Sequence, residues 1–237
     1  MKLTPKPGKL LRLPLFLLLV FVPLVLGACQ SSDDDDPPPF YQTADQLATT
    51  YDSKGEIDEA ERQKIFSYYN KKQWDELETL FTSKNINGGW PPANGGYDVR
   101  DDTPLLSGQE YDRYSNALSG WDGQGEPPLG GSFTSPVKNG QAYSFGQRAL
   151  NKPEAGYDFY FVIEVLKDLP FKGQSATVIP WFDQPGDGVQ TMWKIPKDPN
   201  TGYPLTWNKM AELGYIKITI KKSPSGKYEN LVGTVIQ

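Results

Sequence analysis

The residues best suited to chemistry lie in segment 179–190, which reads IPWFDQPGDGVQ. Strand-forming residues run into a Pro-Gly turn, and a second strand-like run begins at Val189. A bend of this kind would bring Trp181, Gln184 and Gln190 together, so two amide groups and an aromatic ring could face one ligand. Local composition alone favours a simpler interpretation, an ordinary hairpin with an exposed loop.

The sequence contains no histidine. This excludes Ser-His-Asp and Cys-His catalysis and removes the usual base at physiological pH and the commonest zinc ligand. Chemistry must then use carboxylates, amides, hydroxyls, Arg, Lys or aromatic rings, and we expect no metal. The net charge of −5 and the lack of a basic cluster argue against a nucleic-acid partner.

Five other segments precede 179–190 in a fixed order. They are WPPANGGY (90–97), YDRY (111–114), GSFTSP (131–136), RAL (148–150) and YFVIEVLKDLP (160–170). In this order, over about residues 88–220, they resemble the TNT family, named for the tuberculosis necrotizing toxin, whose catalytic domain hydrolyses NAD to nicotinamide and ADP-ribose. The ordered set is far more specific than any one motif, and the resemblance does not extend to residues 30–86.

The resemblance implies which residues serve NAD, as substrate and with no other cofactor. The Arg of the family's D-R-F motif corresponds to Arg113, which can pair bidentately with the pyrophosphate. The Gln of the final motif corresponds to Gln190 or to Gln184, and both alternatives stay open. Arg113, Gln190 and Gln184 are thus the expected catalytic residues, with Gln190 able to orient the ribose hydroxyls or a water.

Four further residues are expected to contact NAD: Arg148, Trp181, Phe182 and Tyr114. Each of the main candidates also has a structural interpretation. Arg113 could be a surface residue paired with Asp112, Arg148 could hold a loop by hydrogen-bonding carbonyls, and Trp181 is as well suited to core packing as to stacking on nicotinamide.

The reaction suits a site without histidine. The bond to be cleaved joins a pyridinium nitrogen to ribose, so nicotinamide leaves as a neutral base and needs no acid. The site must stabilise an oxocarbenium-like transition state and position a water.

The sequence departs from the family pattern at three positions. Phe161 stands where the family has histidine, and Asp183 and Asp187 stand where it has glycine. The loop 115–130 is also longer than in the family. These departures leave open a non-catalytic binding module with the same fold, and an ADP-ribosyltransferase is a third possibility.

The elements that position these residues follow from hydrophobic periodicity. Asp58 and Glu61 begin a helix over about 58–70, and an apolar stripe from Trp74 to Phe81 predicts a second helix that completes a hairpin. Residues 87–151 are rich in Gly, Pro, Asn and Asp, which predicts mostly loops with brief strands such as 131–134.

Strand signals dominate the rest of the chain. We expect strands over 159–166, buried on both faces, and over 177–181, 189–193, 216–220 and 232–236, with a short helix at 206–213. The predicted fold class is α+β, an N-terminal helical hairpin followed by a small, mainly antiparallel β-sheet catalytic domain with long loops.

The N-terminal residues are those of an exported lipoprotein. Residues 1–28 combine basic residues with an apolar run and form an expected signal peptide, and the ending LGAC resembles a lipobox that would lipidate Cys29. An uncleaved transmembrane anchor is the alternative. Residues 29–39 read as an acidic, Pro-rich linker, 40–86 as the helical segment, and 87–237 as the TNT-like NAD glycohydrolase domain.

These features together predict a toxin of the cell envelope or cell surface. Its lipid would anchor it to a membrane, and a toxic activity would require a cognate immunity protein in the producing cell.

Overall fold

The computed structural model describes residues 39–237. The expected signal peptide, Cys29 and nearly all of the linker lie outside the described residues. Over 39–237, the helices are all too short or too polar to cross a membrane.

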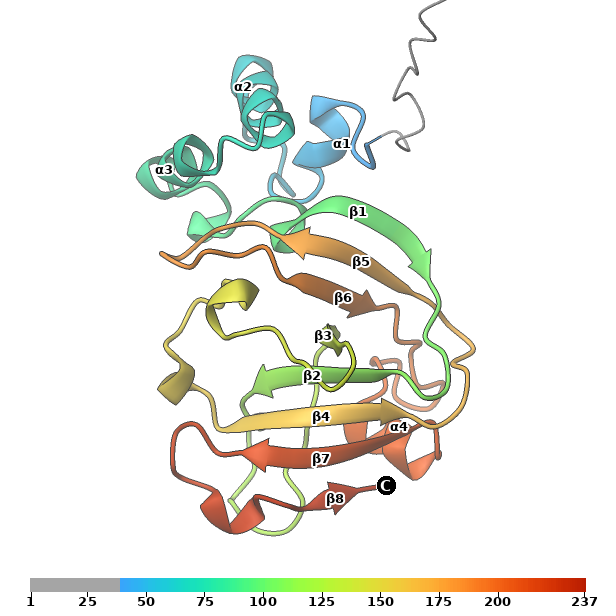
Figure 1. Ribbon diagram of the computed structural model, residues 1–237. Helices are drawn as coiled ribbons and strands as arrows, with labels where there is room; N and C mark the ends of the chain where they lie inside the picture. The colour runs from blue at the N-terminus through green and yellow to red at the C-terminus, as the bar shows by residue number, and fades with distance from the viewer. Residues whose placement is uncertain (1–38) are drawn as a thin grey trace, which may run out of the picture. The chain divides into compact units, whose positions relative to one another are not determined.

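An eight-stranded antiparallel sheet runs through the molecule (Figure 1). In spatial order its strands are β1 (Gly96–Thr103), β5 (Gly173–Val178), β6 (Val189–Trp193), β3 (Phe133–Val137), β2 (Glu110–Ser115), β4 (Phe159–Val165), β7 (Ile216–Lys222) and β8 (Val235–Ile236). With four α-helices among the same residues, the predicted α+β class is confirmed.

Three helices lie at the β1 end of the sheet and one packs near β7 and β8 (Figure 1). They are α1 (Ala44–Ala48), α2 (Glu59–Asn70), α3 (Trp74–Lys84) and α4 (Trp207–Glu212). The predicted hairpin is α2 and α3, and the Asp58 carboxylate caps α2 by accepting the Glu61 N–H at 2.8 Å. The Glu61 carboxylate pairs with Lys84 on α3. The short α1, with a capping box from Thr43 and Gln46, was not predicted.

The interior has two hydrophobic clusters. One lies between α4 and strands β2, β4 and β7, and it contains Phe161, Trp193 and Trp207. The other packs α1, α2 and α3 against Ile179 and Trp181, which follow β5. The helical segment therefore shares a core with the segment that was expected to carry the chemistry.

The structure corrects several predictions about strands. The region 87–151 contains β1 and β2, which were read as loops because their polar residues hide the strand signal. β1 tolerates charges because it is an edge strand. β4 has one buried and one half-buried face, and β5 ends at Val178, so residues 179–181 are not in a strand.

Five short 3₁₀ helices and turns make up much of the remainder of the described residues. The 3₁₀ helices are η1 (Ile86–Gly89), η2 (Ala93–Gly95), η3 (Gly146–Arg148), η4 (Glu154–Gly156) and η5 (Glu229–Leu231). The first three of these lie next to the site described below.

Candidate functional site

A pocket of about 530 Å³ lies where β3 changes its partner strand. β3 pairs with β2 through residues 135–137 and with β6 through Phe133 and Thr134. The ladder between β2 and β3 therefore ends at Asp112, and the next residues of β2, Arg113 and Tyr114, line the pocket. Its volume falls within the roughly 300–1,000 Å³ of small-molecule sites.

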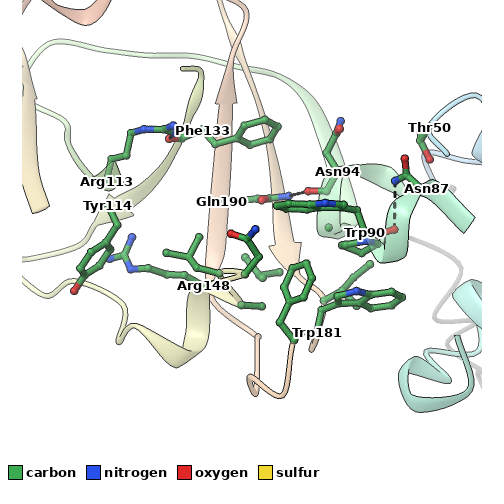
Figure 2. Close-up of a pocket in the computed structure, with 18 of the residues that line it drawn as sticks. Thr50, Asn87, Trp90, Asn94, Arg113, Tyr114, Phe133, Arg148, Trp181 and Gln190 are labelled. Carbon is green, nitrogen blue, oxygen red and sulfur yellow. Dashed lines mark hydrogen bonds between the residues drawn. The ribbon is translucent and has the colours of Figure 1, made fainter. Parts of the chain in front are cut away.

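Six of the seven residues expected to serve the ligand line this pocket: Arg113, Tyr114, Arg148, Trp181, Phe182 and Gln190. They come from β2, η3, the segment after β5, and β6. Figure 2 shows Arg113, Tyr114 and Arg148 on one side, Trp90 and Trp181 on the other, and Gln190 between them. Gln184 does not line the pocket, and its backbone pairs with Trp181 across the turn.

Arg113 is a cation without a carboxylate partner among residues 39–237. Its guanidinium donates to the Phe133 carbonyl, in the gap where the β2–β3 ladder stops, and its buried Nε has no partner among the described groups. A Cβ at Gly131 would overlap this guanidinium, so glycine there makes room for it. Burial lowers the pKa of Arg113 from 12.5 to about 10, so the group is charged at neutral pH.

Arg148 is neutralised by Asp112, a carboxylate that is 0% exposed. The two guanidinium ends contact the two carboxylate oxygens at 2.6 and 2.8 Å, and Arg148 also donates to the Tyr143 carbonyl at 3.0 Å. The Tyr160 hydroxyl donates to the same carboxylate at 2.8 Å. Arg148 therefore holds a loop carbonyl and a buried acid, and Arg113 is the cation left to attract an anion.

Tyr114 extends the same cluster. Its hydroxyl donates to Glu154 at 2.8 Å, and the Arg148 guanidinium lies 5.5 Å from its ring centroid. Burial, followed by the nearby Glu154 carboxylate, raises the pKa of Tyr114. The hydroxyl is thus used in a hydrogen bond to Glu154, and the ring of Tyr114 is the part that can line the pocket.

The aromatic residues of segments 90–97 and 179–190 differ in exposure. Trp181 is 1% exposed, packs edge-on against Phe81, and donates its indole N–H to the Gly89 carbonyl at 2.9 Å, so its role is core packing. Trp90 is 49% exposed and meets the Phe182 ring edge to face at 5.2 Å. Trp90 and Phe182 are therefore the rings that a ligand can reach.

Gln190 is fixed by one hydrogen bond. Its Nε2 donates to the Asn94 carbonyl at 3.0 Å, which Figure 2 shows as a dashed line. A Cβ at Gly96 would lie 2.9 Å from this nitrogen, so Gly96 makes room for the amide. Because one donor is used in this way, the orientation of the amide is set, and its oxygen remains an acceptor for a ligand hydroxyl or a water.

Several lining residues have left-handed backbone conformations that side chains disfavour. Asn87, Asn94, Ala149 and Phe182 have φ between 43° and 55°. Such conformations cost about 1–3 kcal/mol each and cluster at binding sites. Asp183 and Asp187, at φ 56° and 62°, occupy the same region, which explains why glycine also suits these positions.

None of the three positions that depart from the family pattern lies in the pocket lining. The Asp187 carboxylate accepts the Tyr97 hydroxyl at 3.1 Å, and neither Asp183 nor Asp187 lines the pocket. Phe161 is fully buried in the α4-side cluster, and it too is not a lining residue.

Sequence reasoning did not select Trp90, Asn94, Tyr157, Asn87 or Thr50 as site residues, yet all five line the pocket. Trp90 and Asn94 belong to the WPPANGGY motif, so the motif was the available signal. Thr50, which follows α1, lies in a part of the chain where no motif was found.

The chemistry of the lining is that of a site for an anionic, ring-bearing ligand. Of the lining residues, all of which lie within 39–237, none is Asp or Glu, and two are Arg. No group of three or more His, Cys, Asp or Glu side chains in that range could hold a metal ion. Arginine, amide groups and an accessible aromatic pair are what the pocket offers.

No protein-family model and no curated protein matches the sequence. Among solved structures, the tuberculosis necrotizing toxin in complex with its immunity factor is similar to this chain, with 19% sequence identity and a TM-score of 0.34. The match covers 54% of this chain and 60% of that one, so it spans less than two thirds of the toxin chain.

Proposed function

We propose that this pocket binds NAD and hydrolyses it to nicotinamide and ADP-ribose. The observation that carries the proposal is that Arg113, a half-buried cation with no carboxylate partner among the described residues, shares one pocket with Gln190 and the accessible rings of Trp90 and Phe182. The ordered motifs that resemble the TNT family indicate NAD as the substrate, and residues from five of the six motifs line the pocket.

Each group has a part in binding. The Arg113 guanidinium attracts the pyrophosphate, the charged part of NAD, and its partial burial strengthens the interaction relative to one in bulk water. Trp90 and Phe182 offer a surface for the nicotinamide ring. Gln190, oriented by Asn94, presents its amide oxygen to a ribose hydroxyl or to the attacking water.

The bond cleavage needs little acid–base assistance. The C–N bond breaks with its electron pair going to the pyridinium nitrogen, which becomes neutral, while positive charge develops on the ribose. Water then adds to the sugar carbon and releases one proton to solvent. A fixed amide oxygen near that carbon stabilises the developing positive charge and orients the water.

A non-catalytic NAD-binding module is the second candidate. It is favoured by Phe161, which stands where the family has histidine and is buried in the core. Under this alternative the pocket binds NAD and no nicotinamide appears.

We further propose that the chain is exported, anchored to a membrane through lipid on Cys29, and acts as a toxin opposed by an immunity protein. The support is the LGAC sequence after a basic and apolar N-terminal run, together with the resemblance.

The experiment incubates the purified protein with NAD and measures nicotinamide, free ADP-ribose and protein-bound ADP-ribose. Equal amounts of nicotinamide and free ADP-ribose support hydrolysis. Protein-bound ADP-ribose would indicate a transferase instead, and binding of NAD without products would establish the non-catalytic alternative.

A further inference from the structure

Two side chains of the N-terminal helical segment hold the pocket rim. Glu78 on α3 accepts the backbone N–H of Phe182 at 2.8 Å. Thr50, after α1, accepts the backbone N–H of Ala93 at 2.8 Å through its Oγ1. The two contacts join this segment to two backbone positions next to the pocket, one in 179–190 and one in 90–97.

The two residues whose N–H groups donate these hydrogen bonds have the same unusual backbone conformation. Phe182 has φ 55° and Ala93 has φ 52°, a region that non-glycine residues rarely occupy. In each case the acceptor is distant in sequence, by 104 positions for Glu78 and 43 for Thr50. A residue in this conformation persists only when its surroundings hold it, and here the holding groups are side chains of the helical segment.

The held residues lie next to the groups that face the ligand. Phe182 forms the accessible aromatic pair with Trp90, and Ala93 precedes Asn94, whose carbonyl orients Gln190. Release of either backbone would move a ring or the amide of the site.

We propose that Glu78 and Thr50 are positioning residues for the ligand pocket, so that the helical segment 40–86 is an integral part of the binding site. The resemblance to the TNT family begins at about residue 88 and assigns no role to either residue. The proposal rests on the proposed function only for its NAD measurements. The positioning contacts are tested separately.

The first measurement is hydrogen exchange of the Phe182 amide in the parent, Glu78→Ala and Glu78→Gln. Glu78→Gln keeps an oxygen acceptor, and Glu76→Ala is the matched control, because it removes an exposed carboxylate from the same helix. Glu78→Ala should accelerate exchange at Phe182 by about tenfold or more, while amides in the central strands keep their protection. Glu78→Gln should restore most of the protection of the Phe182 amide.

The second measurement is steady-state kinetics on NAD. Glu78→Ala should raise KM about three- to tenfold with a smaller change in kcat, since it misplaces a ring that holds substrate. Glu78→Gln should recover most of the affinity and Glu76→Ala should behave as the parent. For Thr50, Thr50→Val should weaken NAD binding and Thr50→Ser should restore it.

Unchanged exchange at Phe182 in Glu78→Ala would overturn the positioning contact. Faster exchange with an unchanged KM would overturn the role in ligand binding. If the parent does not bind NAD, the proposed function fails, and positioning is then decided by exchange together with Trp90 emission, read as the difference from Trp90→Phe. Glu78→Ala should shift that emission, and an unshifted emission would contradict the proposal.

Discussion

Asp112 forms its ion pair with Arg148, 36 residues further along the chain, and not with Arg113, its neighbour on β2. Side chains alternate faces along a strand, so the two neighbours point to opposite sides. Asp112 lies against Arg148 and Tyr160, whereas Arg113 lies on the face of Tyr111 and reaches the Phe133 carbonyl. This separation leaves Arg113 free of a carboxylate within the described chain and available to an anion.

We expect Asp112→Ala to destabilise the protein strongly. The substitution leaves the Arg148 charge buried without a partner, at a cost of about 3–5 kcal/mol. Asp112→Ala combined with Arg148→Met removes both charges and should recover much of the loss. Urea unfolding of the parent, the single variant and the double variant measures the free energy of unfolding. A double variant no more stable than Asp112→Ala would show that the unpaired Arg148 charge does not cause the destabilisation.

Arg113→Ala should weaken NAD binding without unfolding the protein. A charge-assisted contact with the pyrophosphate is worth about 1.5–3 kcal/mol, or one to two powers of ten in affinity. Arg113→Lys should restore only part of this, because a point charge cannot reproduce the guanidinium fork. Steady-state kinetics should show the effect mainly in KM. Equal KM values for the parent, Arg113→Ala and Arg113→Lys would exclude a contact between Arg113 and the pyrophosphate.

The two tryptophans of the pocket should respond differently to substitution. Trp181→Ala removes a fully buried ring and should cost about 3–5 kcal/mol of stability. Trp90→Ala should leave the melting temperature nearly unchanged and reduce NAD affinity, with Trp90→Phe intermediate. Thermal unfolding and NAD titration separate the two effects. Equal loss of stability in both variants would mean that Trp90 is also a core residue.

Cys29→Ala should abolish lipid attachment. In the proposed anchoring Cys29 accepts the lipid, and it is the single cysteine of the chain. Metabolic labelling with a radioactive fatty acid is the measurement. Equal labelling of the variant and the parent would refute the lipoprotein assignment.

Periodicity alone predicted the helical hairpin, β4, β6, β7 and α4, because each has a clear apolar stripe or alternation. It failed at β1 and β2, whose polar residues are stabilised by an edge position or by the buried pair of Asp112 and Arg148. Such long-range pairing leaves no trace in local composition.

The sequence predicted most of the candidate ligand-binding residues, but not the role of each one. Motif order selected six lining residues, but it could not distinguish Gln190 from Gln184 or Trp90 from Trp181. The difference depends on where β5 ends. After Val178 the chain turns, Trp181 enters the core of α1 to α3, and Gln184 is not among the residues that line the pocket. The role of Thr50 and Glu78 required the tertiary contacts themselves.

Nicotinamide release from NAD by the parent, Gln190→Ala and Gln184→Ala tests the central claim most directly. Gln190 lines the pocket and Gln184 does not, so the pair is matched in chemistry and differs in place. The parent should release nicotinamide, Gln190→Ala should be about ten- to a thousandfold slower at saturating NAD, by analogy with removal of an oriented amide from an active site, and Gln184→Ala should stay near the parent. No release by the parent, or equal rates in all three proteins with the fold intact by circular dichroism, would contradict the account.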